Sequence, residues 1–562
     1  MRVSDSPAVV AVSGHMVDAP DREVPRFPAE QVGRVTREIE ASFDAWRVGP
    51  ATTIVSGGAR GADILAAEAG ILRGARVRLC LAVPPSEFQR RSVELPDTDW
   101  AVRFRQLLQR TDVEVVTSRH EDVEDGDVFT RANVRIVELA RSLAPSPHAV
   151  LVWNGQRGDG TGGTEDLVRR LGCTRPDPRV RVIDPTPRRY EDRQDSPGPK
   201  SLLALDGGGI RGVLTLEVLS ALEQQLRMRS GRPDLVLSDF FDYVGGTSTG
   251  AIIAAALALG APVEHIRERF VTLARKVFRK RLLPMRLRST YRDGPLTQEL
   301  EDFFGAGTTL GDPRFRSLLL VVLHNTVTDS PWPLSNCTRA KYNRADRYLN
   351  AAVDRNLDLR LSALVRGSTA APVYFPPQRM RVGSRDFVFQ DGGMTPFNNP
   401  ALLLSLIATL PEYGLCWPAG EQDLLLVSVG TGSAAAVHPG LRPSQVDLRF
   451  NASNLPGVFM RGASVGQDLV CRSLGRTRAG HELDREFGAR LGGVAPGGRS
   501  LFTYARYDAD LSDEFLATLQ IGGRDARQLR KLDAVRSIPA LQAVGRSVAS
   551  QVDVETHLAG FG

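Results

Sequence analysis

The chain has 562 residues, 42% of them hydrophobic, which predicts two to four domains with substantial cores. Its net charge of +6, from 71 basic and 65 acidic residues, is small for this length and excludes a nucleic-acid-binding protein as the leading interpretation. The five cysteines are scattered without C-x-x-C spacing, which indicates reduced thiols and no metal site. The first residues lack a signal-peptide pattern, and the longest apolar run, 251–263, is too short to span a bilayer. We therefore expect a cytoplasmic protein.

The region from residue 8 to about residue 185 alternates short apolar runs with helical stretches. Six runs read as strands: 8–12, 52–56, 77–83, 113–116, 148–153 and 180–183. Three longer segments read as helices: 32–43, 62–74 and 128–143. This alternation predicts an open, Rossmann-like α/β domain with a mostly parallel sheet and helices on both faces.

Glycine-rich loops follow two of these strands, where a parallel sheet binds its ligands. The loop at 56–63, SGGARGAD, and the loop at 158–165, GDGTGGTE, each open a helix, so free N–H groups could hold a phosphate. A third loop starts at the end of the first strand. The candidate nucleotide-binding residues are Ser13, Gly57, Gly58, Arg60, Gly61, Gly162, Gly163, Thr164 and Glu165. The alternative, that these loops are only tight strand-to-helix turns, stays open.

Residues 186–200 are rich in proline and charge without apolar periodicity, which predicts a linker. After it, Gly246, Ser248 and Gly250 form G-x-S-x-G between a strand-like and a helix-like segment. In such a nucleophile elbow a sharp turn exposes the serine hydroxyl. The N–H group after Ser248, at the start of the helix, would point toward a developing oxyanion.

A second glycine-rich turn, DGGGIRG at 206–212, allows two interpretations. As an oxyanion loop it offers backbone donors from Gly207, Gly208 and Gly209, with the charge of Arg211 beside them. As a dinucleotide-binding G-x-G-x-x-G turn it would need an acidic residue about 20 positions on, at the end of a second strand. Only Glu223 lies at about this separation along the sequence, and it falls inside a helical pattern and not at the end of a strand.

These motifs, with TAAPVYFPP at 369–377, DGGMTPFNNP at 391–400 and LLLVSVGTG at 424–432, resemble the patatin-like phospholipases, in the family's order. The resemblance implies a serine–aspartate dyad, with Ser248 as nucleophile, Asp391 as its base and the glycine loop as oxyanion hole. No catalytic cofactor is then needed. An ordinary triad would instead need a histidine after Asp391, and His438 is the strongest rival base. Asp391 could also be only a turn residue.

The loops of the N-terminal region resemble the SLOG domains, nucleotide-associated Rossmann-like proteins. The segment GTGGTED at 160–166 lacks a proline and the full spacing of the hydrolytic members, so the resemblance implies ligand sensing. Elsewhere, a basic amphipathic stretch at 265–292 could contact anionic headgroups or be an ordinary solvated helix face. Beyond Gly432 the pattern predicts a mostly helical flank.

Together the patterns predict a SLOG-like sensing domain at 1–185, a linker at 186–200 and a patatin-like domain at 201–562, with its catalytic core at 201–432 and its flank at 433–562. The expected function is a nucleotide-regulated phospholipase that cleaves membrane phospholipids at the inner face of the membrane, as an antiviral defence effector. Its activator would be a nucleotide second messenger, with homo-oligomerisation on activation. Two alternatives stay open: a housekeeping lipase whose N-terminal domain mediates assembly, and a non-catalytic scaffold that binds a partner protein.

Overall fold

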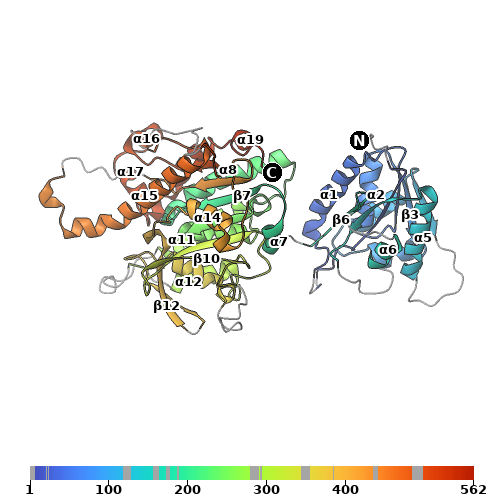
Figure 1. Cartoon of the computed structure of the whole chain (residues 1–562), viewed down its shortest axis with the longest axis horizontal. Coiled ribbons are helices and arrows are strands. Elements are labelled where there is room, and N and C mark those ends of the chain that lie inside the picture. Colours follow the sequence, from blue (N-terminus) through green and yellow to red (C-terminus); the bar gives the residue numbers. More distant parts are fainter. Residues whose placement is uncertain are drawn as a thin grey trace. The chain divides into compact units, whose positions relative to one another are not determined.

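The computed structural model describes the chain except residues 1–6, 21, 23–24, 118–127, 156–163, 172–176, 187–188, 279–289, 292–293, 344–354, 384, 434–440, 484–497 and 562. The chain divides into two compact units, Met1–Pro187 and Arg188–Gly562 (Figure 1). Within the described ranges, every helix is too short or too polar to serve as a transmembrane span.

The first unit holds a six-stranded parallel sheet with the order β4-β3-β2-β1-β5-β6. Its strands are β1 (Val9–Gly14), β2 (Thr53–Ser56), β3 (Arg76–Leu81), β4 (Val113–Thr117), β5 (His148–Val152) and β6 (Val180–Ile183). Its helices are α1 (Val32–Ala45), α2 (Ala62–Leu72), α3 (Pro85–Phe88), α4 (Trp100–Leu108), α5 (Val128–Leu143) and α6 (Thr164–Leu171). All six predicted strands and all three predicted helices are confirmed.

Helices cover both faces of this sheet (Figure 1). Successive residues of β1 point to opposite faces, so Val10 and Val12 join one core cluster and Val9 and Ala11 join another. The first cluster includes residues of α1, α2 and α4, and the second includes residues of α5 and α6. The predicted Rossmann-like α/β fold of this region is therefore confirmed.

The second unit is built on a nine-stranded mixed sheet. Eight strands follow the order β11-β12-β9-β8-β7-β13-β15-β14, and the ninth, β10, pairs with β9. The neighbours from β9 through β8, β7, β13 and β15 to β14 pair in parallel. The pairs β10–β9, β12–β9 and β11–β12 are antiparallel. The strands are β7 (Lys200–Leu205), β8 (Tyr243–Thr247), β9 (Leu318–Asn325), β10 (Ser330–Ser335), β11 (Gln378–Val382), β12 (Arg385–Asp391), β13 (Leu424–Val429), β14 (Arg476–Ala479) and β15 (Thr503–Tyr507).

The helices of this unit are α7 (Tyr190–Asp195), α8 (Gly212–Ser230), α9 (Leu237–Phe240), α10 (Thr249–Ala258), α11 (Val263–Val277), α12 (Gly294–Phe304), α13 (Leu361–Ser368), α14 (Ala401–Thr409), α15 (Leu448–Leu474), α16 (Asp513–Thr518), α17 (Gly523–Leu529), α18 (Ile538–Ala549) and α19 (Val554–His557). A Cβ on Gly245 would meet Leu404 of α14, and one on Gly246 would meet Gly250 of α10. Because adjacent strand residues face opposite ways, α10 and α14 cover opposite faces of the sheet.

The C-terminal part differs from the predicted helical flank at 433–562. It contains helices, but β14 and β15 also extend the central sheet beyond β13. All five residues of β15, TYARY, are buried, including Arg506. A buried arginine interrupts the apolar pattern, and its carboxylate partners, Asp206 and Asp508, offset the cost of burying its charge. The sheet core therefore runs to Tyr507.

The predicted linker at 186–200 is also only partly unstructured. Helix α7 occupies Tyr190–Asp195 and belongs to the second unit, where Tyr190 packs on Phe315. The Arg193 guanidinium lies 2.9 Å from the Asp242 carboxylate, and both side chains are buried. The charged residues of this segment suggested a solvated linker, but one of them, Arg193, belongs to a buried ion pair.

Because the units have separate cores, we expect a fragment of residues 188–562 to unfold at the same temperature as its unit in the full chain. A fragment that starts at Ser196 loses Arg193 and leaves Asp242 buried without its cation, so it should be less stable by about 3 kcal/mol or more. Calorimetry of the two fragments and the full chain measures both effects. Equal stability of the two fragments would contradict this role of α7.

Candidate active site

Ser248 occupies the turn between β8 and α10 that G-x-S-x-G predicted. Its backbone has φ 53° and ψ −122°, a strained conformation typical of nucleophile elbows. A Cβ on Gly246 would lie 2.2 Å from the Gly250 carbonyl oxygen, and one on Gly250 would lie 2.3 Å from the Leu205 oxygen. Both motif glycines are therefore required by close backbone packing.

Asp391 lies against the serine. The Ser248 Oγ donates a hydrogen bond to Asp391 Oδ2 at 2.6 Å, and the Gly393 N–H donates to Oδ1 at 2.8 Å. Strand register explains the meeting, because Thr247 pairs with Val322 of β9 and Asp391 pairs with the next residue, Leu323. Burial raises the pKa of Asp391 to about 6. The two hydrogen bonds favour the charged form and so lower this pKa, but burial has the larger effect.

A second serine, Ser368 at the end of α13, fixes the elbow. Its Oγ accepts a hydrogen bond from the Ser248 N–H at 2.8 Å and donates to the Val322 carbonyl at 2.6 Å. The sequence analysis missed this residue, although it directly precedes the segment at 369–377. Since the Ser248 N–H is engaged, it does not serve as an oxyanion donor in this structure.

The glycine loop lies beside the elbow. Thr249 Oγ1 donates to the Gly209 carbonyl at 2.8 Å, and Gly209 and Ser248 line the same pocket. The Gly207 N–H, however, donates to the Asn398 carbonyl at 3.1 Å. Among the hydrogen bonds of the described residues, the N–H groups of Gly208 and Gly209 are donors in none. Of the three predicted backbone donors, Gly208 and Gly209 thus remain candidates, and Gly207 does not.

Arg211 lies beside the glycine loop and bonds one of its carbonyls and a carbonyl of a second turn. Its Nη1 donates to the Gly432 carbonyl at 2.9 Å and its Nε to the Gly208 carbonyl at 3.3 Å. It therefore connects the glycine loop to the G-T-G turn after β13. The dinucleotide interpretation of this turn also fails, because Glu223 lies within α8 and pairs with Arg227 at 2.7 Å.

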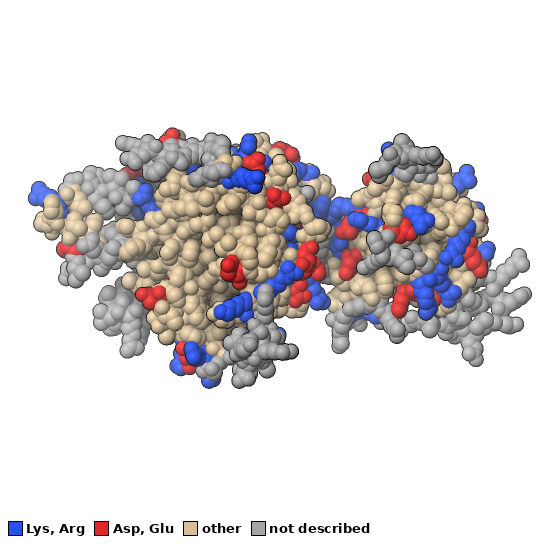
Figure 2. Space-filling model, viewed as in Figure 1, with Lys and Arg blue, Asp and Glu red and all other residues tan. Residues whose placement is uncertain are grey.

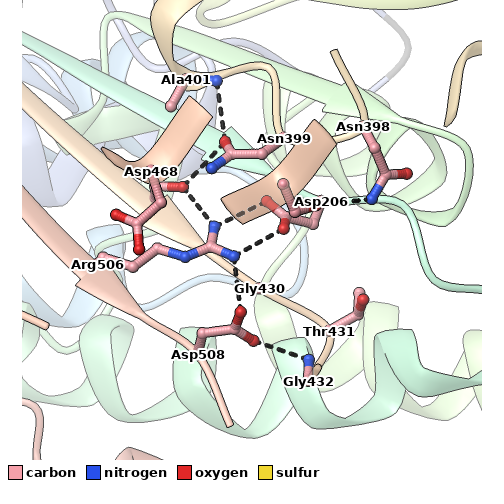
Figure 3. Close-up of polar contacts among 12 residues, drawn as sticks. Asp206, Asn398, Asn399, Ala401, Gly430, Thr431, Gly432, Asp468, Arg506 and Asp508 are labelled. Atoms are coloured by element: carbon pink, nitrogen blue, oxygen red, sulfur yellow. Dashed lines mark hydrogen bonds and ion pairs between the residues drawn. The ribbon is translucent and has the colours of Figure 1, made fainter. Parts of the chain in front are cut away.

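A buried ion network holds the first residue of the glycine loop (Figure 3). The two Nη atoms of Arg506 lie 2.8 and 2.7 Å from the carboxylate oxygens of Asp206, and Nη2 also lies 2.8 Å from Asp508 Oδ2. Asp508 Oδ1 accepts the Gly432 N–H at 2.8 Å. Gly432 is thus bonded through its N–H to Asp508 and through its oxygen to Arg211. The sequence analysis identified neither Arg506 nor Asp508.

Ser248 opens into a pocket whose empty space, about 580 Å³, includes a part that is open to solvent. Apolar side chains from α10, α11, α12, α15 and the 369–377 segment line most of it. They include Ile252, Phe270, Leu273, Val277, Phe278, Leu296, Tyr374, Phe375, Met460 and Leu532. Apart from Ser248, Thr249, Thr369 and Asp391, its side chains offer little polar surface, so it suits an apolar chain with a reactive group at Ser248.

The histidines do not compete with Asp391 where the structure describes them. His557 lies 2.9 Å from the Tyr507 hydroxyl, and His481 lines a polar cavity with Arg506 and Asp508. His438, the rival base, falls outside the described residues.

The first unit brings several predicted nucleotide-binding residues to one edge of its sheet. Ser13 lies near the end of β1, and Gly57 and Gly58 follow β2, the adjacent strand. β1 is flanked by β2 and β5, the switch point at which such sheets bind ligands. There His15 Nε2 and Asn154 Oδ1 lie 2.8 Å apart. Thr164 and Glu165 begin α6, whereas Gly162 and Gly163 lie outside the described residues.

Arg60 and Gly61 serve the loop itself. Arg60 Nε donates to the Val17 carbonyl at 2.9 Å and Nη1 to the Glu94 carbonyl at 3.4 Å. Gly61 has φ 95°, and a Cβ there would lie 3.0 Å from the His15 oxygen. Arg60 Nε and Nη1 are thus engaged by backbone carbonyls, and Gly61 is required by close backbone packing.

Residues 203–405 match the family model of the patatin-like phospholipases. This part of the chain is a patatin-like phospholipase domain. The family comprises lipid acyl hydrolases with a serine nucleophile.

Several relatives share this region. A 256-residue alignment with patatin-like protein 1 of Arabidopsis thaliana is 29% identical and covers 42% of this chain and 59% of the relative. A cGAMP-activated phospholipase of Escherichia coli (strain TW11681) is 27% identical over 43% of this chain and 64% of its own length. Patatin-2-Kuras 4 of Solanum tuberosum is 29% identical over 42% and 62%. The chain thus spans less than two thirds of these relatives.

The ion network behind the patatin-like domain's glycine loop leads to a stability prediction. Arg506→Met leaves Asp206 and Asp508 buried without their shared cation, so we expect a loss of about 3–5 kcal/mol in the free energy of unfolding. Adding Asp206→Asn should recover part of this loss, because it removes one buried charge. Urea denaturation of the two single variants and the double variant measures the coupling. Losses that simply add would contradict the network.

Proposed function

We propose that this chain is a phospholipase that uses Ser248 and Asp391 as a catalytic dyad to cleave acyl esters of membrane glycerophospholipids. The single observation that carries the proposal is the 2.6 Å hydrogen bond from Ser248 to Asp391 at the end of an apolar pocket. The patatin-like phospholipase match over 203–405 supports the same chemistry. Intact machinery of this kind disfavours a non-catalytic scaffold.

The geometry suggests a two-step mechanism. Asp391 accepts the Ser248 proton as Oγ attacks the ester carbonyl, and the resulting oxyanion receives hydrogen bonds from the Gly208 and Gly209 N–H groups and the start of α10. Protonated Asp391 then gives its proton to the leaving alcohol, which leaves an acyl-enzyme. Asp391 then takes a proton from water as the water oxygen attacks the acyl carbonyl. The bond between the acyl group and Ser248 Oγ breaks, the carboxylic acid leaves, and protonated Asp391 returns its proton to Oγ.

Ser248→Ala and Asp391→Asn should each lower kcat for ester hydrolysis by about a thousandfold or more, because residues that act as one unit fail together. His438→Ala, which removes the rival base, should retain full activity. Assays use phospholipid vesicles and a short-chain soluble ester, with thermal unfolding to confirm that each variant is folded. Robust turnover by Asp391→Asn, or loss of turnover in His438→Ala, would refute the dyad.

The pKa of Asp391, raised by burial to about 6, gives a pH dependence. Only the ionised carboxylate accepts the serine proton, so the active fraction is nearly complete at pH 8 and falls as pH drops through the raised pKa. We expect kcat/KM to halve near pH 6 and to fall about tenfold per pH unit below pH 5. A pH–rate profile with a soluble ester measures the limb, with fluorescence to confirm folding at each pH. A limb near pH 4 would contradict the raised pKa of Asp391, and the Asp391→Asn assay would still decide whether Asp391 is the base.

We further propose that the first unit is a SLOG-like sensor that makes this activity depend on a nucleotide second messenger. The relative named as a cGAMP-activated phospholipase favours this regulation. Within the unit, His15, Asn154 and the Gly57–Gly58 turn gather at the switch point of the sheet. A phospholipase that is held inactive until a signal arrives fits an antiviral defence effector acting at the inner face of the membrane.

Arg60→Ala tests the sensor. The change frees the Val17 and Glu94 carbonyls from their shared cation and loosens the candidate loop, so we expect nucleotide activation to be lost while basal hydrolysis is retained. It is a cleaner change than Gly58→Asp, because Gly58 has φ 79° and any side chain there is strained. Activity is measured with and without cGAMP and related cyclic dinucleotides.

The fragment 188–562 should not respond to any nucleotide and serves as the control. Calorimetric titration of the full chain and of Arg60→Ala measures binding directly. A full chain that is fully active without nucleotide, or normal activation of Arg60→Ala, would contradict the sensor proposal and favour an assembly role for the first unit.

A further inference from the structure

The carbonyl of Gly207, in the glycine loop, is held by side chains from two distant parts of the chain. Thr431 Oγ1 donates a hydrogen bond to it at 2.9 Å, and Asn398 Nδ2 donates one at 3.3 Å. Both side chains are buried. The two bonds fix the direction of this carbonyl, because a buried donor that loses its acceptor is costly.

Thr431, which makes the shorter of these bonds, belongs to the G-T-G turn after β13, and this turn is fixed on both sides of it. Before Thr431, the Gly430 N–H donates to the Tyr507 carbonyl at 2.8 Å. After Thr431, the Gly432 N–H donates at 2.8 Å to Asp508, a member of the buried ion network (Figure 3). The hydroxyl of Thr431 therefore meets the glycine loop from a rigid position.

The peptide group between Gly207 and Gly208 carries this constraint toward the nucleophile. In a trans peptide the carbonyl of one residue and the N–H of the next point in opposite directions. The bonds to the Gly207 carbonyl thus also set the direction of the Gly208 N–H, which donates to no acceptor in the described part of the chain. This peptide lies against the elbow, because a Cβ built on Gly207 would lie 3.1 Å from Ser248 Cβ.

We propose that Thr431 is a positioning residue for ester hydrolysis, which aims the Gly208 N–H at the oxyanion by holding the Gly207 carbonyl. This inference rests on the proposed function, which assigns that N–H to the oxyanion. Thr431 is not one of the described residues that line the Ser248 pocket, so it acts through the loop. A donor that is fixed before the reaction stabilises the oxyanion without reorganisation, and a hydrogen bond to the carbonyl also polarises the N–H of the same peptide.

Packing is the alternative role for Thr431. A Cβ on Gly208 would lie 2.1 Å from Thr431 Oγ1 and 2.4 Å from Thr431 Cβ, so the two residues are in close contact. This contact explains why residue 208 is a glycine, but it does not require a hydroxyl group. Packing depends on the volume of the side chain at position 431, whereas positioning depends on its Oγ1, and substitutions can separate the two.

Thr431→Val removes the hydroxyl and keeps the shape of the side chain. It should lower kcat for a short-chain soluble ester by about tenfold or more with little change in KM, because loss of a complete oxyanion donor costs about a hundredfold or more. Thr431→Ser, which keeps the hydroxyl, should recover most of this loss. Thr503→Val is the matched control. The Thr503 hydroxyl is buried at the start of β15 and donates to the Glu421 carbonyl at 2.7 Å, away from the pocket lining, so its loss should leave kcat unchanged.

A short-chain trifluoromethyl ketone tests the oxyanion itself. Ser248 Oγ adds to its carbonyl carbon, the serine proton passes to Asp391, and the carbonyl oxygen becomes an oxyanion. Thr431→Val should weaken inhibition by the ketone by about the factor by which it lowers kcat. The affinity for the matching alcohol, which cannot form an oxyanion, should not change. A purely structural role would weaken both ligands alike.

Equal kcat in Thr431→Val and the unaltered chain overturns the proposal, and so does an equal loss of affinity for the ketone and the alcohol. If calorimetry shows that Thr431→Val does not fold, the same comparison is made between Thr431→Ser and Thr431→Ala, which differ only by the hydroxyl. An unaltered chain that neither hydrolyses the ester nor binds the ketone more tightly than the alcohol refutes the proposed function instead, and the positioning role falls with it.

Discussion

The site depends on one buried cation, Arg506, placed between two carboxylates. Asp206 begins the glycine loop, and Asp508 bonds the Gly432 N–H, so a single guanidinium fixes the loops that follow β7 and β13 (Figure 3). Removing one partner of a buried ion pair leaves an uncompensated charge, which is strongly destabilising. The shape of the glycine loop therefore depends on the two Nη groups of Arg506, which carry all of its carboxylate contacts, whereas its Nε is buried without a hydrogen-bond partner among the described residues.

Local patterns predicted the elements that carry the chemistry. The glycine spacing of G-x-S-x-G reflects backbone contacts within the motif and with β7, which any sequence with this turn must satisfy. The six strands of the first unit are short apolar runs with helices between them, and periodicity identifies such runs. The resemblance to the patatin-like phospholipases implied that Asp391 would serve Ser248, and β9 supplies the register that joins them.

Long-range polar contacts could not be predicted in the same way. Arg506 lies 300 positions from Asp206, and Ser368 lies 120 positions from Ser248, so no spacing rule connects them. Gly207 and Gly208 look equivalent in the sequence, yet the Asn398 carbonyl takes the N–H of Gly207. Arg193 suggested a solvated linker because its partner, Asp242, is distant in sequence. In each case a buried polar group acquires its role from a partner that folding supplies.

Two aspartates in this site are equally buried but differ in what faces them. Asp206 meets the Arg506 guanidinium with both oxygens, which favours its charged form, but burial outweighs this and raises the pKa of Asp206 to about 6, as it does for Asp391. Asp391 meets a neutral hydroxyl and one backbone N–H, and no cation contacts it among the described residues. Its carboxylate keeps a high proton affinity next to the serine. The two carboxylates thus differ in what they contact: Asp206 is held by the Arg506 guanidinium, whereas Asp391 lies against the Ser248 hydroxyl, in position to accept the serine proton.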